Sequence, residues 1–183
     1  MSVVLVTGPT RSGKSEWAET LAARSHKSVI YVATAQDYLD DPEWQDRISR
    51  HQQRRSPQWE TRSVPMDLSA TLQSATPHQC LLVDALGTWL ANWLEHDEST
   101  WDNRVVELLT CLQATESEVI LVAEEVGWGV VPAYPLGRLF RDRLGNLTRR
   151  VGAIADIVYL VTAGYVLNLS ELGTPLPDQL GSE

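Results

Sequence analysis

Short apolar segments alternate with longer segments of helical periodicity along most of the chain. The apolar or alternating segments predict strands, and the longer segments between them predict helices. The expected strands are residues 3–6, 28–32, 59–64, 80–84, 119–123, 156–161 and 166–169, the last one antiparallel at an edge. The expected helices are residues 15–23, 40–55, 66–74, 101–114 and 136–150, with another beginning near residue 87. This order is typical of an α/β fold, in which helices cover both faces of a mostly parallel sheet.

The loop after the first expected strand reads Gly8-Pro9-Thr10-Arg11-Ser12-Gly13-Lys14-Ser15, which fits the pattern G-x-x-x-x-G-K-[ST]. This pattern is the P-loop, whose glycines allow backbone N–H groups to point at phosphate oxygens. Lys14 is expected to reach the β- and γ-phosphates, and the Ser15 hydroxyl is expected to bind Mg²⁺. The alternative is an ordinary glycine-rich turn. Because a strand precedes the loop and a helix follows it, we expect a RecA-like P-loop NTPase fold that binds a nucleoside triphosphate.

Polar residues follow two further strands, at the edge of the sheet where α/β proteins bind ligands. Asp84 ends an apolar strand, as a Walker B carboxylate does, and we expect it to hold Mg²⁺ together with Ser15. The alternative is a helix N-cap, because a helix begins nearby. After the strand 28–32, the residues expected to lie beside the P-loop and contact the nucleotide are Thr34, Ala35 and Gln36.

Glu124 and Glu125 open a glycine-rich loop at the end of another expected strand. Such a loop suits a metal, a catalytic base or a substrate, and it also suits a plain connection from strand to helix. Asp84 and Gly87 also fit the D-x-x-G element of switch GTPases. Neither lysine of the chain lies in the N-K-x-D motif with which those proteins read guanine, so we do not expect a switch GTPase.

The overall composition narrows the class of protein. A chain of 183 residues suits one domain, which we expect to span residues 1–169, with a flexible tail at 170–183. A net charge of −9 argues against nucleic acid as the main partner. Cys80 and Cys111 support no disulfide framework. No signal peptide or membrane span is recognisable, and the cytoplasm is the expected compartment.

A series of more specific motifs follows the P-loop. They comprise Gly8 and residues 11–15, residues 31–35, then Arg47, Ile48, His51, Arg55, Trp59 and Thr61, residues 125–132, Arg138, residues 140–142 and Gly145, and finally Ala155, Asp156 and Val158. Over about residues 3–165 this order resembles the bifunctional adenosylcobinamide kinase / adenosylcobinamide-phosphate guanylyltransferase family of cobalamin biosynthesis. The segment around His51 and the loop 125–132 are far more specific than the P-loop.

The resemblance implies two reactions. ATP or GTP phosphorylates the aminopropanol hydroxyl of adenosylcobinamide, and GTP guanylylates a histidine that passes GMP to adenosylcobinamide phosphate, giving adenosylcobinamide-GDP. The matching histidine is His51, so the expected catalytic residues are His51 and Lys14. On its own, His51 suits a packing residue, because it shares a helix face with Trp44 and Ile48. Further expectations are Mg²⁺ as the cofactor, a homotrimer, and nucleotide contacts from Gln52, Gln53, Arg54 and Arg55.

The chain departs from the family pattern at several positions. Pro9 replaces a glycine, Glu124 replaces an asparagine, and Ser63 occupies the position of a glutamate associated with guanine nucleotide binding. Further departures are Thr148 and Arg149, in place of an Asn-Gln pair, and Asn168, in place of a terminal lysine. Two other hypotheses stay open. One is a P-loop kinase of another small alcohol in which the histidine is inert, and the other is a non-catalytic nucleotide-binding regulatory protein.

Overall fold

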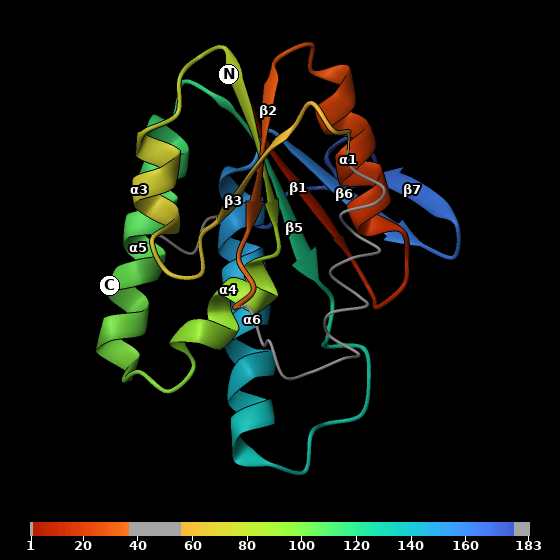
Figure 1. The fold of residues 1–183 in the computed structure, drawn as a ribbon. Coiled ribbons are helices and arrows are strands. Elements are labelled where there is room, and N and C mark those ends of the chain that lie inside the picture. The colour runs from red at the N-terminus through yellow and green to blue at the C-terminus, as the bar shows by residue number, and fades with distance from the viewer. Residues whose placement is uncertain (1, 37–55, 178–183) are drawn as a thin grey trace.

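A seven-stranded sheet with the order β3-β2-β4-β5-β1-β6-β7 forms the centre of the protein (Figure 1). The computed structural model describes residues 2–36 and 56–177. The strands are β1 Ser2–Gly8, β2 Ser28–Ala33, β3 Glu60–Ser63, β4 Gln79–Asp84, β5 Glu118–Glu124, β6 Ile157–Thr162 and β7 Tyr165–Asn168. All neighbouring strands pair in parallel except β6 and β7, which are antiparallel at one edge. The mostly parallel sheet with an antiparallel edge strand is therefore confirmed.

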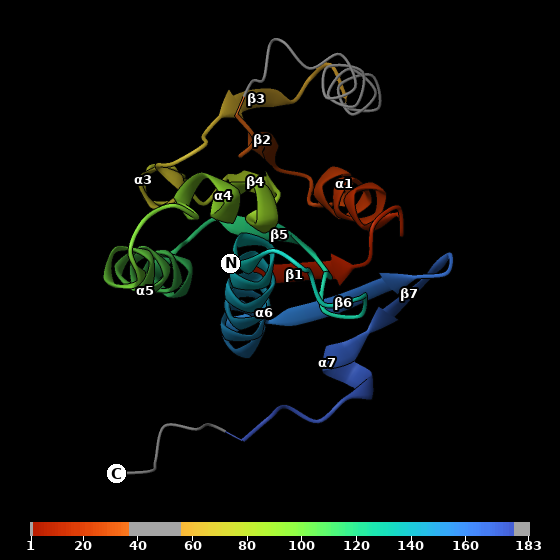
Figure 2. The same cartoon turned by 90° about the horizontal axis from the view of Figure 1, so that it is seen from below.

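Helices cover both faces of this sheet, with α1 on one face and α3 to α6 on the other (Figure 2). Their bounds are α1 Lys14–Arg24, α3 Leu68–Gln73, α4 Leu86–Trp93, α5 Glu98–Ala114, α6 Pro135–Ile154 and α7 Leu169–Leu172. Helix α7 begins at Leu169 and continues to Leu172, within the start of the segment 170–183 that was expected to be a flexible tail. The helix expected over residues 40–55 lies outside the described residues. No helix in the described part of the chain is long and apolar enough to cross a membrane.

The alternation of side chains along the strands fills two apolar cores, one on each face of the sheet. In β1, Val3 and Leu5 face the core under α3 to α6, whereas Val4 and Val6 face the core under α1. Fully burying one such side chain stabilises the fold by about 1.5–3 kcal/mol. The middle parts of β1, β4 and β5 are apolar on both faces, so the polar residues of these strands lie near their ends.

The strand order corrects one expectation. Residues Thr34 to Gln36 were expected beside the P-loop, but β4 and β5 lie between β2 and β1. The carboxyl ends of β1 and β2 are therefore not neighbours, and this adjacency is wrong. Parallel strands are joined by crossovers that can skip positions in the sheet, so consecutive strands need not pair. The residue that reaches the start of α1 from the strand next to β2 in the sheet is Asp84 of β4.

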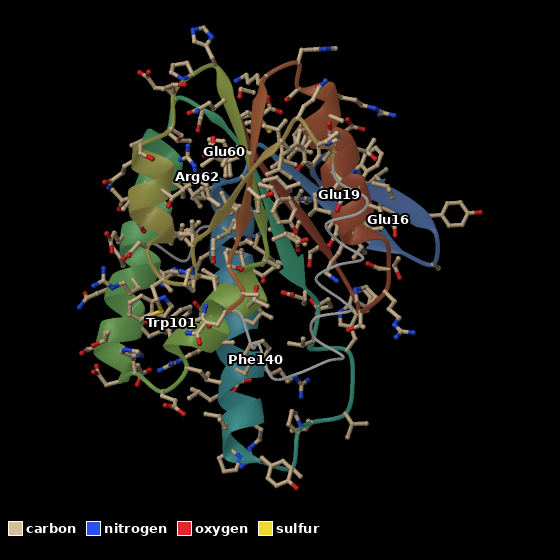
Figure 3. All side chains as sticks on the ribbon, in the orientation of Figure 1. Glu16, Glu19, Glu60, Arg62, Trp101 and Phe140 are labelled. Atoms are coloured by element: carbon tan, nitrogen blue, oxygen red, sulfur yellow. The ribbon has the colours of Figure 1, made fainter. Side chains whose placement is uncertain are left out.

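The edge strand β3 carries an ion pair on its surface. Arg62 Nε donates to Glu60 Oε1 at 2.6 Å and its Nη2 donates to Glu60 Oε2 at 3.2 Å (Figure 3). The two side chains share one face because they are two residues apart. Charged residues on an edge strand discourage pairing with another chain. Ser63, the last residue of β3, is exposed.

Candidate nucleotide-binding and active site

The P-loop joins β1 to α1 through a tight turn. Ser12 N donates to Pro9 O at 3.3 Å, and Gly13 adopts a φ of 92°, a conformation that favours glycine. A Cβ on Gly8 would overlap the carbonyl oxygen of Val161, so only glycine allows β1 to approach β6 this closely. The backbone therefore requires glycine at the two positions where the motif places it.

Donor groups converge at the amino end of α1. Ser12 Oγ is buried and has no hydrogen-bond partner within the described part of the chain. Lys14 is only 9% exposed, and its Nζ donates to Pro9 O at 3.4 Å. Buried polar groups in proteins are nearly always hydrogen-bonded, and the amino end of a helix attracts anions. These groups therefore suit the oxygens of a bound phosphate.

Asp84 lies at the carboxyl end of β4 and faces the start of α1. Ser15 Oγ donates to Asp84 Oδ1 at 3.4 Å, and the hydroxyl of Tyr31 donates to Asp84 Oδ2 at 2.6 Å. The N-cap residue of α4 is Ala85, so the alternative that Asp84 caps this helix is excluded. The two oxygen ligands expected for a Walker B site thus come together, although they belong to different elements.

The oxygen atoms of Ser15 and Asp84 are of the type that binds magnesium in proteins. Among residues 2–36 and 56–177, no group of three or more His, Cys, Asp or Glu side chains could hold a metal ion. Magnesium is usually held by one or two carboxylates together with substrate phosphates, rather than by a cage made of protein ligands alone. Ser15 and Asp84 supply oxygen ligands of this kind next to the P-loop.

Glu124 ends β5, the strand that separates β1 from β4. Its partner in the β1–β5 register is Gly8, and its Oε2 accepts a hydrogen bond from Gly87 N at 3.0 Å. Burial raises the pKa of this carboxyl; the charge of Lys14 opposes the rise and that of Asp84 adds to it. Glu124 therefore lies within the electrostatic reach of both the P-loop lysine and the Walker B carboxylate.

The end of β2 is bonded to the start of α4. Thr34 is fully buried, and its Oγ1 donates to Ala85 O at 2.6 Å and lies 2.6 Å from Thr88 Oγ1. Asn92 Nδ2 donates to Thr34 O at 2.9 Å and to Pro65 O at 2.8 Å. The hydroxyl of Thr34, a residue expected to contact the nucleotide, thus bonds to the segment that follows Asp84.

Hydrogen bonds hold the glycine-rich loop after β5 to the P-loop at its start and to α6 further along. Glu125 N donates to Gly8 O at 2.9 Å, which ties the start of the loop to the P-loop. From α6, Arg141 Nη2 donates to Gly127 O at 2.7 Å, and Arg138 Nη1 donates to Ala133 O at 2.7 Å. Two arginines of α6 therefore hold the backbone of this loop.

Several expected site residues cannot be compared with the structure. His51, Gln52, Gln53, Arg54 and Arg55 lie outside the described residues. Conversely, sequence reasoning missed Tyr31 and Asn92, which contact Asp84 and the end of β2 respectively. A tyrosine inside a buried apolar strand was the available signal for the first, because a buried phenol normally needs a hydrogen-bond partner. An asparagine on a mostly apolar helix was a weaker signal for the second.

The family profile and the similar proteins of known sequence all belong to cobalamin biosynthesis. The sequence profile of the family described as cobinamide kinase / cobinamide phosphate guanyltransferase matches residues 4–169. The bifunctional adenosylcobalamin biosynthesis protein CobP of Pseudomonas aeruginosa is 41% identical over 174 residues, covering 94% of this chain and 98% of that protein. The protein CobU of Salmonella typhimurium, with the same description, is 36% identical over 177 residues, covering 88% and 96%. A solved structure from Pyrococcus horikoshii, titled Project ID PH0250, shares the fold with a TM-score of 0.61, 9% identity, and coverage of 99% of this chain and 94% of that chain.

Proposed function

The chain belongs to the cobinamide kinase / cobinamide phosphate guanyltransferase family, and from this premise we propose how its residues carry out the two reactions. The protein is a bifunctional enzyme of cobalamin biosynthesis with cobinamide kinase and cobinamide phosphate guanylyltransferase activities. The finer proposal is that adenosylcobinamide is the substrate, that ATP or GTP is the phosphate donor, and that GMP passes through His51. The cytoplasmic location expected from the sequence is likewise a proposal.

The observation that carries the proposal is the group of donors around the P-loop. The buried Ser12 hydroxyl, the Lys14 ammonium and the amino end of α1 would hold the phosphates of the triphosphate. Ser15 and Asp84 would hold Mg²⁺, which supplies charge neutralisation for the transferring phosphoryl group when it is bound. Preorganised donors of this kind stabilise the charge that develops in the transition state.

In the kinase reaction, the aminopropanol hydroxyl oxygen of adenosylcobinamide attacks the γ-phosphorus. The bond from this phosphorus to the β–γ bridging oxygen breaks, the nucleoside diphosphate leaves, and the hydroxyl proton passes to solvent. Lys14 orients the β- and γ-phosphates and offsets the charge that moves onto the leaving oxygen. The products are adenosylcobinamide phosphate and the diphosphate.

In the guanylyl transfer, an imidazole nitrogen of His51 attacks the α-phosphorus of GTP, and pyrophosphate leaves. A phosphate oxygen of adenosylcobinamide phosphate then attacks the same phosphorus and breaks the nitrogen–phosphorus bond. Adenosylcobinamide-GDP leaves, and the imidazole returns to its neutral form. Neutral imidazole is a suitable nucleophile because its reference pKa is near 6.5.

A labelling experiment tests this proposal. We expect the protein to retain the label from GTP labelled at the α-phosphate and not from GTP labelled at the γ-phosphate. A bond between GMP and histidine is a phosphoramidate, so the label should be lost in acid and kept in mild base. His51→Ala should remove the label, whereas His78→Ala, a change at an exposed position of the described chain, should keep it.

Two outcomes would contradict parts of the proposal. If the wild-type protein phosphorylates adenosylcobinamide but never takes the α-label, the covalent guanylyl step is wrong. If the label stays on the protein when adenosylcobinamide phosphate is added, the histidine does not serve as an intermediate. The replacement of the family glutamate by Ser63 makes the first outcome informative about guanine nucleotide binding.

We also propose the homotrimer that the resemblance implies. The support is a group of large apolar side chains exposed on β7, α7 and the segment after them, namely Tyr165, Val166, Leu167, Leu169, Leu172 and Leu176. Exposed apolar side chains that cluster in this way often mark a protein interface. Light scattering should give three times the chain mass of 20.4 kDa, and Leu172→Arg should lower it. A monomer mass for the wild-type chain would contradict the trimer.

A further inference from the structure

Tyr31 is a polar residue inside an apolar core. It lies in β2 and is only 2% exposed, and its ring belongs to the core between α1 and the sheet. Its partner in the β2–β4 register is Leu82, whose side chain lies in the same core. Asp84 stands two residues further along β4 and therefore faces the same side of the sheet. The phenol oxygen reaches along this face to the carboxylate of Asp84.

The carboxylate of Asp84 is contacted at both oxygens. Ser15 Oγ donates to Oδ1 at 3.4 Å from the α1 side, and the Tyr31 hydroxyl donates to Oδ2 at 2.6 Å from β2. The second bond is short, as hydrogen bonds from hydroxyls to carboxylates are. A carboxylate that is bonded through one oxygen turns less freely about its side-chain torsions, so the other oxygen keeps its direction.

The ring and the hydroxyl of Tyr31 have separable roles. The ring contributes apolar packing, which phenylalanine would provide equally well. The hydroxyl contributes the hydrogen bond to Asp84, and a buried phenol needs such a partner. Outer-shell groups of this kind orient the ligands of metal sites, and their removal typically costs 10–100-fold in metal affinity or activity.

We propose that Tyr31 is a positioning residue that holds Asp84 with Oδ1 turned towards Ser15, in the direction where the metal of the metal–triphosphate complex would bind. This inference rests on the proposed function, because it assumes that Asp84 and Ser15 hold the metal. It adds a residue from β2 to a site that the sequence motifs assign to the P-loop and β4 alone. Tyr31 acts through Asp84 and does not touch the reacting atoms.

The test compares two variants, each of which loses one tyrosine hydroxyl from a ring that packs on this core. Tyr31→Phe removes the bond to Asp84, whereas Tyr159→Phe changes a ring that packs on the same core against Trp17, at 5.5 Å between ring centroids. The probe is Mn²⁺, titrated into each protein with bound ADP and followed by the electron paramagnetic resonance signal of the free ion. The second quantity measured is the affinity for ADP in the absence of metal, in a buffer that contains EDTA.

We expect Tyr31→Phe to weaken Mn²⁺ binding by about 10–100-fold and to leave ADP binding in EDTA unchanged. Tyr159→Phe should change neither quantity. In the kinase assay, Tyr31→Phe should lower kcat and raise the Mg²⁺ concentration needed for half-maximal rate, with the KM for ATP unchanged at saturating Mg²⁺. A purely structural role of the tyrosine would instead lower the melting temperature and leave the metal dependence unchanged.

Asp84→Asn separates failure of this inference from failure of the proposed function. If Asp84→Asn weakens Mn²⁺ binding and Tyr31→Phe does not, the positioning role is overturned while the metal role of Asp84 stands. If Asp84→Asn itself leaves Mn²⁺ binding unchanged, the proposed metal site is wrong, and the role of Tyr31 is overturned with it.

Discussion

Ser15 and Asp84 are 69 positions apart in the sequence, yet their side-chain oxygens lie 3.4 Å apart. The serine stands in the first turn of α1, and the aspartate ends β4, which is separated from β1 by β5. The two side-chain oxygens that we propose as Mg²⁺ ligands are thus held close together by two different elements of the fold. A site built in this way holds its geometry before the nucleotide arrives, which is what electrostatic catalysis requires.

The first prediction concerns Asp84. Asp84→Asn keeps the size of the side chain but removes the negative charge that would hold Mg²⁺. We expect Mg²⁺-dependent phosphoryl transfer to fall on the order of 100-fold, or about 3 kcal/mol. Nucleotide binding measured without Mg²⁺ should change far less. If both quantities fall equally, Asp84 acts on the nucleotide site without the metal.

The second prediction concerns Lys14, one of the two lysines of the chain. Lys14→Ala should lower turnover at least about 100-fold, because the ammonium that offsets charge on the phosphates is removed. The melting temperature should stay close to that of the wild type. Lys27→Ala is the matched control, since Lys27 lies 3.9 Å from Glu118 Oε2 at the far end of the sheet and should keep full activity. Full kinase activity in Lys14→Ala would contradict the P-loop assignment.

The sequence predicted the elements well because each one carries its own periodic pattern. The strands of the sheet were read from apolar or alternating segments such as residues 80–84, and the observed strand is Gln79–Asp84. The approach of Asp84 to Ser15 was also predicted, because both residues belong to motifs whose spacing to an apolar strand is fixed. Local patterns in the sequence were thus sufficient to predict the strands and the polar residues at their carboxyl ends.

The strand order and the partners of single side chains were not predictable in the same way. Nothing in residues 28–36 indicates that two strands separate β2 from β1, and this led to the wrong adjacency for Thr34. Nothing in the helical pattern of residues 136–150 indicates that Arg143 is buried, as it is in the structure. Both facts depend on how elements far apart in the sequence meet in space, which no local pattern encodes.

The third prediction follows from that buried arginine. Arg143 donates to the carbonyl oxygens of Trp93, Leu94 and His96 at 3.3–3.5 Å, where α4 ends. Arg143→Ala should destabilise the fold by about 3 kcal/mol, because these carbonyls lose their charged donor and a cavity remains. Arg149→Ala, at an exposed position of the same helix, should cost less than about 0.5 kcal/mol. Urea unfolding of the two variants measures the difference, and equal stabilities would show that Arg143 is dispensable at this helix end.

The last prediction concerns the pH dependence of stability through Glu124. Burial raises the pKa of this carboxyl above its usual value of 4.5, so the folded state binds its proton more tightly than the unfolded state does. The protonated carboxyl of Glu124 therefore contributes to the free energy of unfolding. This contribution is fully present below pH 4.5 and is lost as the pH rises through the pKa of the folded state. Glu124→Gln can still accept the hydrogen bond from Gly87 N but carries no charge to bury.

We therefore expect Glu124→Gln to melt at a higher temperature than the wild type at pH 8, with the difference shrinking as the pH falls towards 4.5. Glu116→Gln, at an exposed position before β5, should follow the wild-type curve throughout. Differential scanning calorimetry across this pH range measures both variants. If the difference in melting temperature between Glu124→Gln and the wild type is the same at every pH, the pKa of this carboxyl is the same in the folded and unfolded states. A lower melting temperature at pH 8 would mean that the negative charge of Glu124, near Lys14, stabilises the folded site more than its burial costs.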